Sequence, residues 1–198
     1  MNIGLFGGSF DPPHMGHVKL ACAAIRHNGL DRTYILPAAC SPFKEGAVSS
    51  DEDRLTLCAL SFPASCSVSD YEIAKGGKSY TVETVRHFRD LYPTDRLFWI
   101  VGEDQLLIFN TWFRFEEILQ TATLCAAVRK GSTKLETLET YADKHLRAFG
   151  EVRIMEFEPF EISASEIRRR VSAGEDIHGL VAPTAEEYIL EKGLYRAI

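Results

Sequence analysis

The chain has 198 residues, of which 45% are hydrophobic and 25% charged, and its formal net charge at pH 7 is −6. These values are typical of one globular domain spanning residues 1–198 and argue against a disordered or fibrous chain. The acidic balance argues against a nucleic-acid binder, because such proteins need a basic surface. No apolar run reaches the ~18 residues of a membrane span. We therefore expect a cytoplasmic protein with no membrane partner.

The cysteines predict a reducing compartment. They are odd in number and scattered, and they include no C-x-x-C pair, so neither a disulfide framework nor a zinc site is expected. The five are Cys22, Cys40, Cys58, Cys66 and Cys125.

The N-terminal stretch predicts a strand, a tight turn and a helix. Residues 1–6 form a short apolar run, and residues 18–27 carry apolar side chains at helical spacing. Between them stands Gly7-Gly8-Ser9-Phe10-Asp11-Pro12-Pro13-His14-Met15-Gly16-His17. Adjacent glycines let the backbone turn sharply and approach a ligand, and a helix start offers unpaired N–H groups to an anion. We interpret this stretch as a phosphate-binding site.

Two histidines strengthen this interpretation. His14 and His17 are three residues apart at the start of the expected helix, so both can reach one bound group. Gly16 between them leaves room for a planar ring or a phosphate. A lone histidine is more often structural, but this pair directly follows a glycine turn that opens a helix.

The next elements are a strand at residues 33–36, a loop at residues 37–50 and a helix at residues 51–60. The loop leaves the C-terminal end of a strand, where ligands bind in open α/β sheets, and it carries Lys44. Ser50 or Asp51 can cap the helix. Its expected apolar stripe consists of Leu55, Cys58 and Ala59 or Leu60. Arg54 is interpreted as an exposed arginine that pairs with Asp51 or Asp53.

A third strand is expected at residues 66–73, followed by a turn at residues 75–78 and a helix at residues 79–91. Ser79 is the predicted cap of this helix. Its apolar face is predicted to consist of Val82, Val85, Phe88 and Leu91.

Residues 96–101 are apolar on both faces, as a central parallel strand would be. The strand ends in Gly102-Glu103-Asp104, where a carboxylate can orient a sugar hydroxyl or a metal-bound water. Trp112 and Phe113 follow on a polar loop. Aromatic side chains are more often core than ligand contacts, so both interpretations stay open here.

The last third continues the alternation with strands at residues 123–128 and 152–155, and helices at residues 134–148 and 185–190. Arg129 ends the first of these strands. Ser163 and Glu166 have the spacing of a capping box, and a capped helix start can bind phosphate. Arg168 would lie one turn further along that helix. The alternation predicts an α/β fold, a Rossmann-like doubly wound domain with a mainly parallel sheet and helices on both faces.

The run G-G-S-F-D-P-P-H-M-G-H, with its H-x-G-H element, resembles the signature of the nucleotidylyltransferase superfamily, and most of all that of bacterial nicotinate-nucleotide adenylyltransferases. Four later stretches are similar to motifs of that family, and the resemblance covers essentially the whole chain. The family motifs are P-x-x-x-x-P-x-K, matched at residues 37–44, S-Y-T-x-x-T at 79–84, G-x-D at 102–104, and I-S-S-T-x-I-R, which reads I-S-A-S-E-I-R at 162–168 of this chain. Glu103, Ala164 and Ser165 depart from the common forms of these motifs.

The resemblance implies that nicotinate mononucleotide attacks the α-phosphorus of ATP, which carries Mg²⁺, and that pyrophosphate leaves. The attacking phosphate is already an oxyanion, so no general base is needed. The implied catalytic residues are His14, His17 and Arg168. The implied ATP-binding residues are Gly7, Gly8, Ser9, Phe10, His17, Gly102, Asp104, Ser163, Ser165 and Arg168. The implied mononucleotide-binding residues are Ser9, Phe10, Lys44, Tyr80, Thr81, Thr84, Trp112, Phe113 and Arg129. Roles for Arg169 and Arg170, and self-association into a homo-oligomer, are left open.

Three alternatives remain. The acceptor could be nicotinamide mononucleotide or phosphopantetheine, or the protein could be a nucleotide sensor without catalysis. Class I aminoacyl-tRNA synthetases share H-x-G-H, but this chain has no K-M-S-K-S loop. The sequence shows no Ser-His-Asp set, activated cysteine context or metal-ligand cluster, so covalent catalysis has little support.

Overall fold

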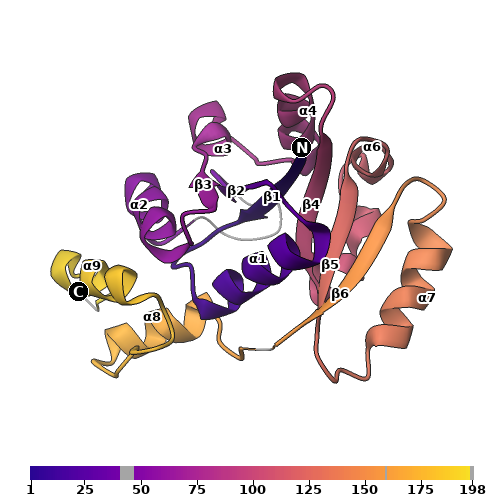
Figure 1. Ribbon diagram of the computed structural model, residues 1–198. Coiled ribbons are helices and arrows are strands. Elements are labelled where there is room, and N and C mark those ends of the chain that lie inside the picture. Colours follow the sequence, from indigo (N-terminus) through magenta and orange to yellow (C-terminus); the bar gives the residue numbers. More distant parts are fainter. Residues whose placement is uncertain (41–46, 159, 197–198) are drawn as a thin grey trace.

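The computed structural model describes residues 1–40, 47–158 and 160–196. Its centre is a sheet of six strands in the order β3-β2-β1-β4-β5-β6, and every neighbouring pair is parallel (Figure 1). The strands are β1 (Asn2–Gly8), β2 (Arg32–Pro37), β3 (Cys66–Val68), β4 (Arg96–Gly102), β5 (Thr123–Arg129) and β6 (Val152–Phe157). This order is that of a doubly wound Rossmann-like sheet, whose direction of winding reverses between β1 and β4. The predicted fold class is confirmed.

The helices follow the strands in alternation. They are α1 (Met15–Asn28), α2 (Asp51–Ser61), α3 (Tyr71–Lys75), α4 (Thr81–Leu91), α5 (Glu103–Leu106), the 3-10 turn η1 (Phe109–Thr111), α6 (Phe115–Thr121), α7 (Leu135–His145), α8 (Ala164–Ser172) and α9 (Pro183–Lys192).

The sheet has a hydrophobic core on each face, as alternation along β4 shows. Trp99 points into the core formed with α4, α5, α6 and α7, whereas Phe98 and Ile100 point into the core formed with α1 and α2. Successive side chains of a strand face opposite sides, so a strand buried on both sides must be apolar throughout. In Figure 1, α1 lies in front of the sheet. Helices therefore cover both faces, as predicted.

A third, smaller core joins α2 to the C-terminal helices α8 and α9. Leu57 of α2 packs with Ile167 of α8 and Ile189 of α9, and all three are fully buried. Figure 1 shows α8 and α9 beside α2, at one side of the sheet. This core brings the helix that starts at Ala164 toward the end of β1 from which α1 departs.

Several predicted elements differ from the structure. Residues 66–73 do not form one strand, because β3 ends at Val68 and the following residues form the short helix α3. Ser79 does not cap α4; the N-cap is Tyr80, and the Ser79 hydroxyl accepts a hydrogen bond from Ala39 N at 3.1 Å. Leu91, expected on the buried face of α4, is exposed. Helices α5 and α6 were not predicted.

In α2 the cap is Ser50, whose hydroxyl accepts from Asp53 N at 3.1 Å. Cys58 lies on the buried face, as predicted, and of the two alternatives Leu60 packs half-buried against the small core whereas Ala59 is exposed. Leu57, which the predicted stripe did not include, is also buried. Arg54 is also on this face with a side chain that is 1% exposed, so the expectation of a solvent-exposed arginine is wrong.

Cys22, Cys58, Cys66 and Cys125 are free thiols. Burial raises the pKa of Cys66 to about 11 and that of Cys125 to about 12. Such thiols are poor nucleophiles at neutral pH. None of the helices in the described part of the chain has the length and apolar character of a membrane span.

Candidate phosphate-binding site

The glycines at the end of β1 serve packing rather than a turn. Gly7 and Gly8 are both within the strand. A Cβ on Gly7 would lie 2.9 Å from the Trp99 ring, and a Cβ on Gly8 would lie 2.9 Å from the Phe10 ring. The left-handed backbone conformation occurs at Phe10, with φ 46°. The predicted glycine turn is wrong, because the chain turns after the strand.

Phe10 holds the turn in place through its side chain. Its ring is 2% exposed and packs edge-on against Phe6, Phe62 and His17. Phe10 can therefore offer a ligand its backbone but not its ring. Ser9, just before it, is half-buried, and its carbonyl accepts a hydrogen bond at 3.0 Å from Arg54 Nη1.

The two histidines lie together at the start of α1. His14 is the N-cap and His17 the third helical residue, and their rings stack with centroids 3.6 Å apart. Nδ1 of His17 accepts from His14 N at 3.2 Å, so the neutral ring carries its proton on Nε2. Gly16 accommodates the imidazole of His14, which would lie 3.0 Å from a Cβ there. The space expected beside Gly16 for a ligand is thus occupied by His14.

The first amide of α1 is already used. Met15 N donates to the carbonyl of Leu180 at 2.9 Å, a contact between the helix start and the segment before α9. An anion at this helix start would therefore depend on the side chains and the remaining amides, because this donor has a partner.

Arg168 reaches the histidine loop from the other end of the chain. Its Nη1 donates to the carbonyl of Asp11 at 2.7 Å, across 157 positions of sequence. Ser163 caps α8 by accepting from Glu166 N at 3.2 Å, and Ser165 Oγ accepts from Arg168 Nη2 at 3.4 Å. The structure thus places the start of α8 and its arginine beside the loop that carries both histidines.

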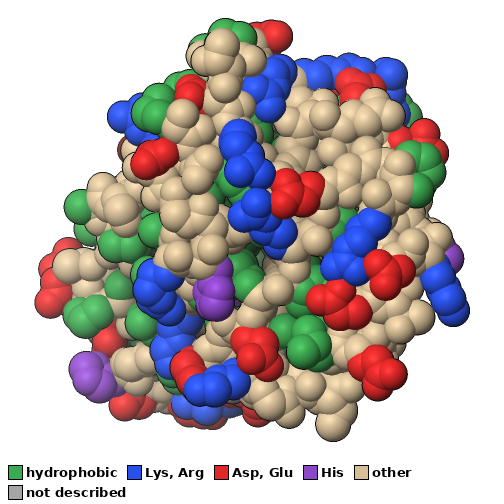
Figure 2. All heavy atoms as spheres, turned by 45° about the vertical axis from the view of Figure 1, so that its right-hand side comes forward, with side chains coloured by type: hydrophobic (Ala, Val, Ile, Leu, Met, Phe, Trp, Pro, Cys, Tyr) green, Lys and Arg blue, Asp and Glu red, His purple; other side chains and the backbone are tan. Residues whose placement is uncertain are grey.

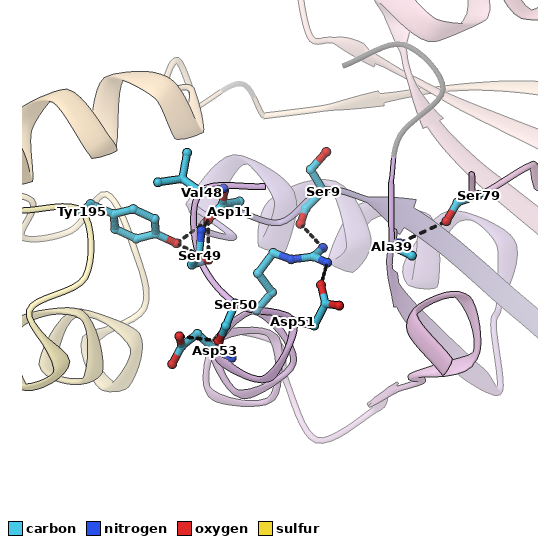
Figure 3. Close-up of polar contacts among 11 residues, drawn as sticks. Ser9, Asp11, Ala39, Val48, Ser49, Ser50, Asp51, Asp53, Ser79 and Tyr195 are labelled. Carbon is cyan, nitrogen blue, oxygen red and sulfur yellow. Dashed lines mark hydrogen bonds and ion pairs between the residues drawn. The ribbon is translucent and has the colours of Figure 1, made fainter. Parts of the chain in front are cut away.

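Asp11 links the loop to two further segments, as Figure 3 shows. Its carboxylate is 4% exposed and accepts from Val48 N at 2.6 Å and from Ser49 Oγ at 2.5 Å. It also accepts from the hydroxyl of Tyr195 at 2.7 Å. No local sequence pattern connects Asp11 with Tyr195, because the two residues are 184 positions apart.

Arg54 supports the same loop from α2. Its guanidinium donates to the Ser9 carbonyl at 3.0 Å and pairs with Asp51 one helical turn earlier. The predicted pairing with Asp51 is correct. The side chain is nevertheless buried, because the Ser9 carbonyl gives it a second acceptor inside the protein.

The residues near the start of α4 that are expected to face a mononucleotide differ in burial. Tyr80 and Thr81 are half-buried there, and Tyr80 lies 5.2 Å from the Phe113 ring. Thr84 is fully buried, and its hydroxyl donates to Glu72 Oε1 at 2.7 Å. This side chain therefore anchors α4 to α3, and its predicted contact with a ligand stays a prediction. Lys44 lies outside the described residues.

Glu72 is a buried carboxylate that the sequence analysis did not identify. It is 3% exposed, and burial raises its pKa above the ordinary value of 4.5 although the hydroxyls of Thr84 and Ser79 oppose this shift. The Ser79 backbone N–H donates to the Cys40 carbonyl at 2.9 Å. Glu72 thus sits where α3, α4 and the segment after β2 meet.

The two aromatic residues of the next loop differ in exposure. Trp112 is half-buried and packs on Phe109 with ring centroids 4.8 Å apart, whereas Phe113 is 58% exposed. Trp112 is thus partly a core residue. Phe113 and Tyr80 together form the aromatic edge of this part of the molecule.

The carboxyl end of β4 carries one buried and one exposed acid. Glu103 is 7% exposed and accepts from Lys134 Nζ at 2.9 Å, with Arg129 Nε 4.0 Å away. Asp104 is exposed, as expected of a residue that meets a ligand. Lys134 Nζ also lies 3.8 Å from Asp104 Oδ1, so this one lysine partly compensates the charge of both acids. Arg129 also pairs with Glu161 at 3.0 Å.

The other arginines of α8 are occupied by acids. Arg169 pairs with Glu166 at 2.9 Å and with Glu175 at 2.7 Å, and Arg170 pairs with Glu166 at 2.9 Å. These contacts lower the pKa of Glu166 to about 2. Glu166 therefore serves the arginines and does not complete the predicted capping box.

Charges are mixed on the face shown in Figure 2, where basic side chains lie beside acidic ones. Arg153 pairs with Glu151 at 2.7 Å and Lys130 with Glu158 at 2.8 Å. Such a face does not present the continuous positive surface that nucleic acid requires. Among residues 1–40, 47–158 and 160–196, no group of three or more His, Cys, Asp or Glu could hold a metal ion.

The fold and the loop after β1 define the class of protein. A cytidylyltransferase-like family model matches residues 5–170, which include both histidines and Arg168. The chain therefore belongs to the cytidylyltransferase-like family. The resemblance drawn from the sequence motifs is confirmed.

The names of curated relatives state a more specific activity than the family model does. A protein of Neisseria meningitidis serogroup B named "Probable nicotinate-nucleotide adenylyltransferase" is 36% identical over 98% of each chain. A protein of the same name from Chlorobaculum parvum is 39% identical over 100% of each chain. The solved structure of Plasmodium falciparum nicotinic acid mononucleotide adenylyltransferase complexed with NaAD shares the fold, with a TM-score of 0.76 and 18% identity. That match covers 98% of this chain and 97% of the other.

Proposed function

We propose that this chain is a nicotinate-nucleotide adenylyltransferase of NAD biosynthesis, acting in the cytoplasm as a single domain. It joins ATP and nicotinate mononucleotide to give nicotinate adenine dinucleotide and pyrophosphate. Two relatives that match essentially the whole chain carry this name. The observation on the chain itself that supports the proposal is the contact of Arg168 with the loop that carries His14 and His17.

The chemistry follows from these donors. The phosphate of the mononucleotide attacks the α-phosphorus of ATP in line, and negative charge builds on the oxygens around that phosphorus. His17, whose Nε2 is a donor, and His14 hold these oxygens. Arg168 and the start of α8, capped by Ser163, hold the β- and γ-phosphates of MgATP. The Mg²⁺ ion arrives with this substrate.

The remaining contacts are assigned by position. The backbone of residues 7–10 forms one wall of the phosphate site, with the side chain of Phe10 in the core. Gly102 and Asp104, at the end of β4, face the adenosine. Tyr80, Thr81, Trp112 and Phe113 line the mononucleotide side, and Lys44 belongs there by its motif. Arg129, held by Glu161, stands at the edge of this region.

The test is pyrophosphate release by the full-length protein from MgATP with each of three acceptors: nicotinate mononucleotide, nicotinamide mononucleotide and phosphopantetheine. We expect turnover with the pyridine mononucleotides and a higher kcat/KM for the acid. Preference for phosphopantetheine would replace the acceptor while keeping the reaction class. Tight binding of ATP without pyrophosphate release under any acceptor would identify a sensor and refute the proposed activity.

A further inference from the structure

Tyr195 lies near the end of the chain but contacts the phosphate loop. Its hydroxyl donates to Asp11 Oδ1 at 2.7 Å and lies 3.2 Å from Ser49 Oγ, which donates to the same oxygen. In Figure 3 the ring points from the C-terminal segment toward these two residues. The contact therefore joins the segment after α9, the loop after β1 and the segment before α2.

The backbone at Tyr195 is held in an uncommon conformation. Its φ is +62°, in the left-handed region that favours glycine. Gly193, which ends α9, also has a positive φ of +65°, so two residues in this short segment take the left-handed conformation. A non-glycine residue keeps such a conformation only where its surroundings fix it. Here the hydrogen bond to a buried carboxylate supplies that constraint.

Two connections from the C-terminal helices meet on one residue. Arg168 of α8 donates to the Asp11 carbonyl at 2.7 Å, while Tyr195 donates to the Asp11 carboxylate. Helices α8 and α9 share one small core. The backbone carbonyl and the side-chain carboxylate of Asp11 thus both help to set the distance between Arg168 and the histidine loop. Loss of the carboxylate contact would leave Arg168 bonded to the Asp11 carbonyl and Met15 N bonded to the Leu180 carbonyl.

We propose that Tyr195 is a positioning residue for the triphosphate part of the site, acting through Asp11. It fixes the loop that carries His14 and His17 relative to α8, which carries Arg168. This proposal rests on the proposed function, because it assumes that both groups hold one triphosphate. It implies that the hydroxyl matters more to steps that involve ATP than to binding of the acceptor.

A matched control exists on α9. Tyr188 donates its hydroxyl to Asp53 Oδ1 at 2.9 Å, which also joins a C-terminal tyrosine to a carboxylate of the α2 region. Asp53 makes its other hydrogen bonds in the described residues with Ser50 at the helix cap, and none of them is with Asp11. Tyr188→Phe therefore removes a similar hydrogen bond without touching Asp11.

The experiment compares Tyr195→Phe, Ser49→Ala and Tyr188→Phe in the full-length protein. For Tyr195→Phe we expect kcat/KM for MgATP to fall about tenfold with KM for nicotinate mononucleotide within about twofold of wild type. Ser49→Ala should act in the same direction, and the double variant should lose less than the product, because both hydroxyls serve one oxygen. Tyr188→Phe should leave both parameters unchanged.

Thermal denaturation establishes that each variant is folded. If Tyr195→Phe does not fold, Ser49→Ala carries the comparison. Wild-type kinetics in a folded Tyr195→Phe, or an equal loss in Tyr188→Phe, would overturn the proposal. Should the wild-type protein release no pyrophosphate, the proposed function fails, and calorimetric binding of a non-hydrolysable ATP analogue then tests Tyr195 separately. Weaker analogue binding by about three- to tenfold for Tyr195→Phe alone would support the positioning role, and equal binding would refute it.

Discussion

Replacing Arg54 by methionine tests whether a buried guanidinium supports the phosphate loop. The side chain is 1% exposed, donates to the Ser9 carbonyl at 3.0 Å and pairs with Asp51. Methionine has a similar length and can fill the space, so the change removes the charge and its hydrogen bonds with little cavity.

The expected magnitude follows from two opposing terms. Loss of a charge-assisted hydrogen bond, with the Ser9 carbonyl left without this donor, costs about 1.5–3 kcal/mol. Removing the buried charge returns part of this cost, because the guanidinium no longer has to be desolvated. Asp51 is more than half exposed and regains water, so it adds little. The net loss should be about 1–2 kcal/mol, which lowers the Tm of a chain of this length by roughly 2–8 °C.

Thermal and urea denaturation followed by circular dichroism measure this loss. The matched control is Arg86→Met on α4, where the arginine is 45% exposed and pairs with Glu117. A solvent-exposed pair contributes about 0–1 kcal/mol, so the control should change the Tm less. A shift for Arg54→Met no larger than that of the control would refute the reasoning and restore the surface interpretation of this residue.

Three further changes test the site and its supports. His17→Ala should lower kcat by roughly two decades, the scale of losing one preorganised charge stabiliser, without unfolding the protein; retention of wild-type kcat would remove His17 from the mechanism. Thr84→Val should lower stability by about 1–3 kcal/mol in urea titrations, because buried Glu72 loses a donor, and a Tm equal to wild type would contradict that anchor. Since burial raises the pKa of Glu72, its stabilising contribution is complete below its ordinary value of 4.5 and is lost as pH rises through the folded-state pKa. Glu72→Gln should therefore lose less stability than wild type as the pH rises above 4.5, and parallel pH curves would refute this.

The sheet could be predicted because its signal is local. Each central strand is a short run that is apolar on both faces, and the run at residues 96–101 falls within β4. The start of α8 could also be predicted, because Ser163 caps the helix by accepting a hydrogen bond from the backbone N–H of Glu166, three residues later. The prediction of one strand at residues 66–73 was wrong for the same reason, because the local alternation continues past Val68. In the structure β3 consists of three paired residues, and a helix begins at Tyr71.

The supports of the site could not be predicted, because each depends on a partner far along the chain. Arg54 was interpreted as exposed since charged side chains rarely lie inside, and its acceptor is the Ser9 carbonyl 45 positions away. Thr84 matched a binding motif, but its hydroxyl is used by Glu72. A motif gives the residue type and spacing at a site. It does not say which members touch a ligand and which hold the others in place.

An acidic chain that binds two phosphate-bearing substrates needs positive charge that its own acids leave available, and α8 shows how this is arranged. Arg169 and Arg170 donate to carboxylates, so their charge is largely neutralised within the helix. Arg168 donates instead to a backbone carbonyl and a hydroxyl, neither of which carries a net charge. These neutral acceptors orient the guanidinium without cancelling its field. Among the described residues, Arg168 is thus the arginine of α8 that pairs with no carboxylate, which is why we propose that its charge serves the triphosphate.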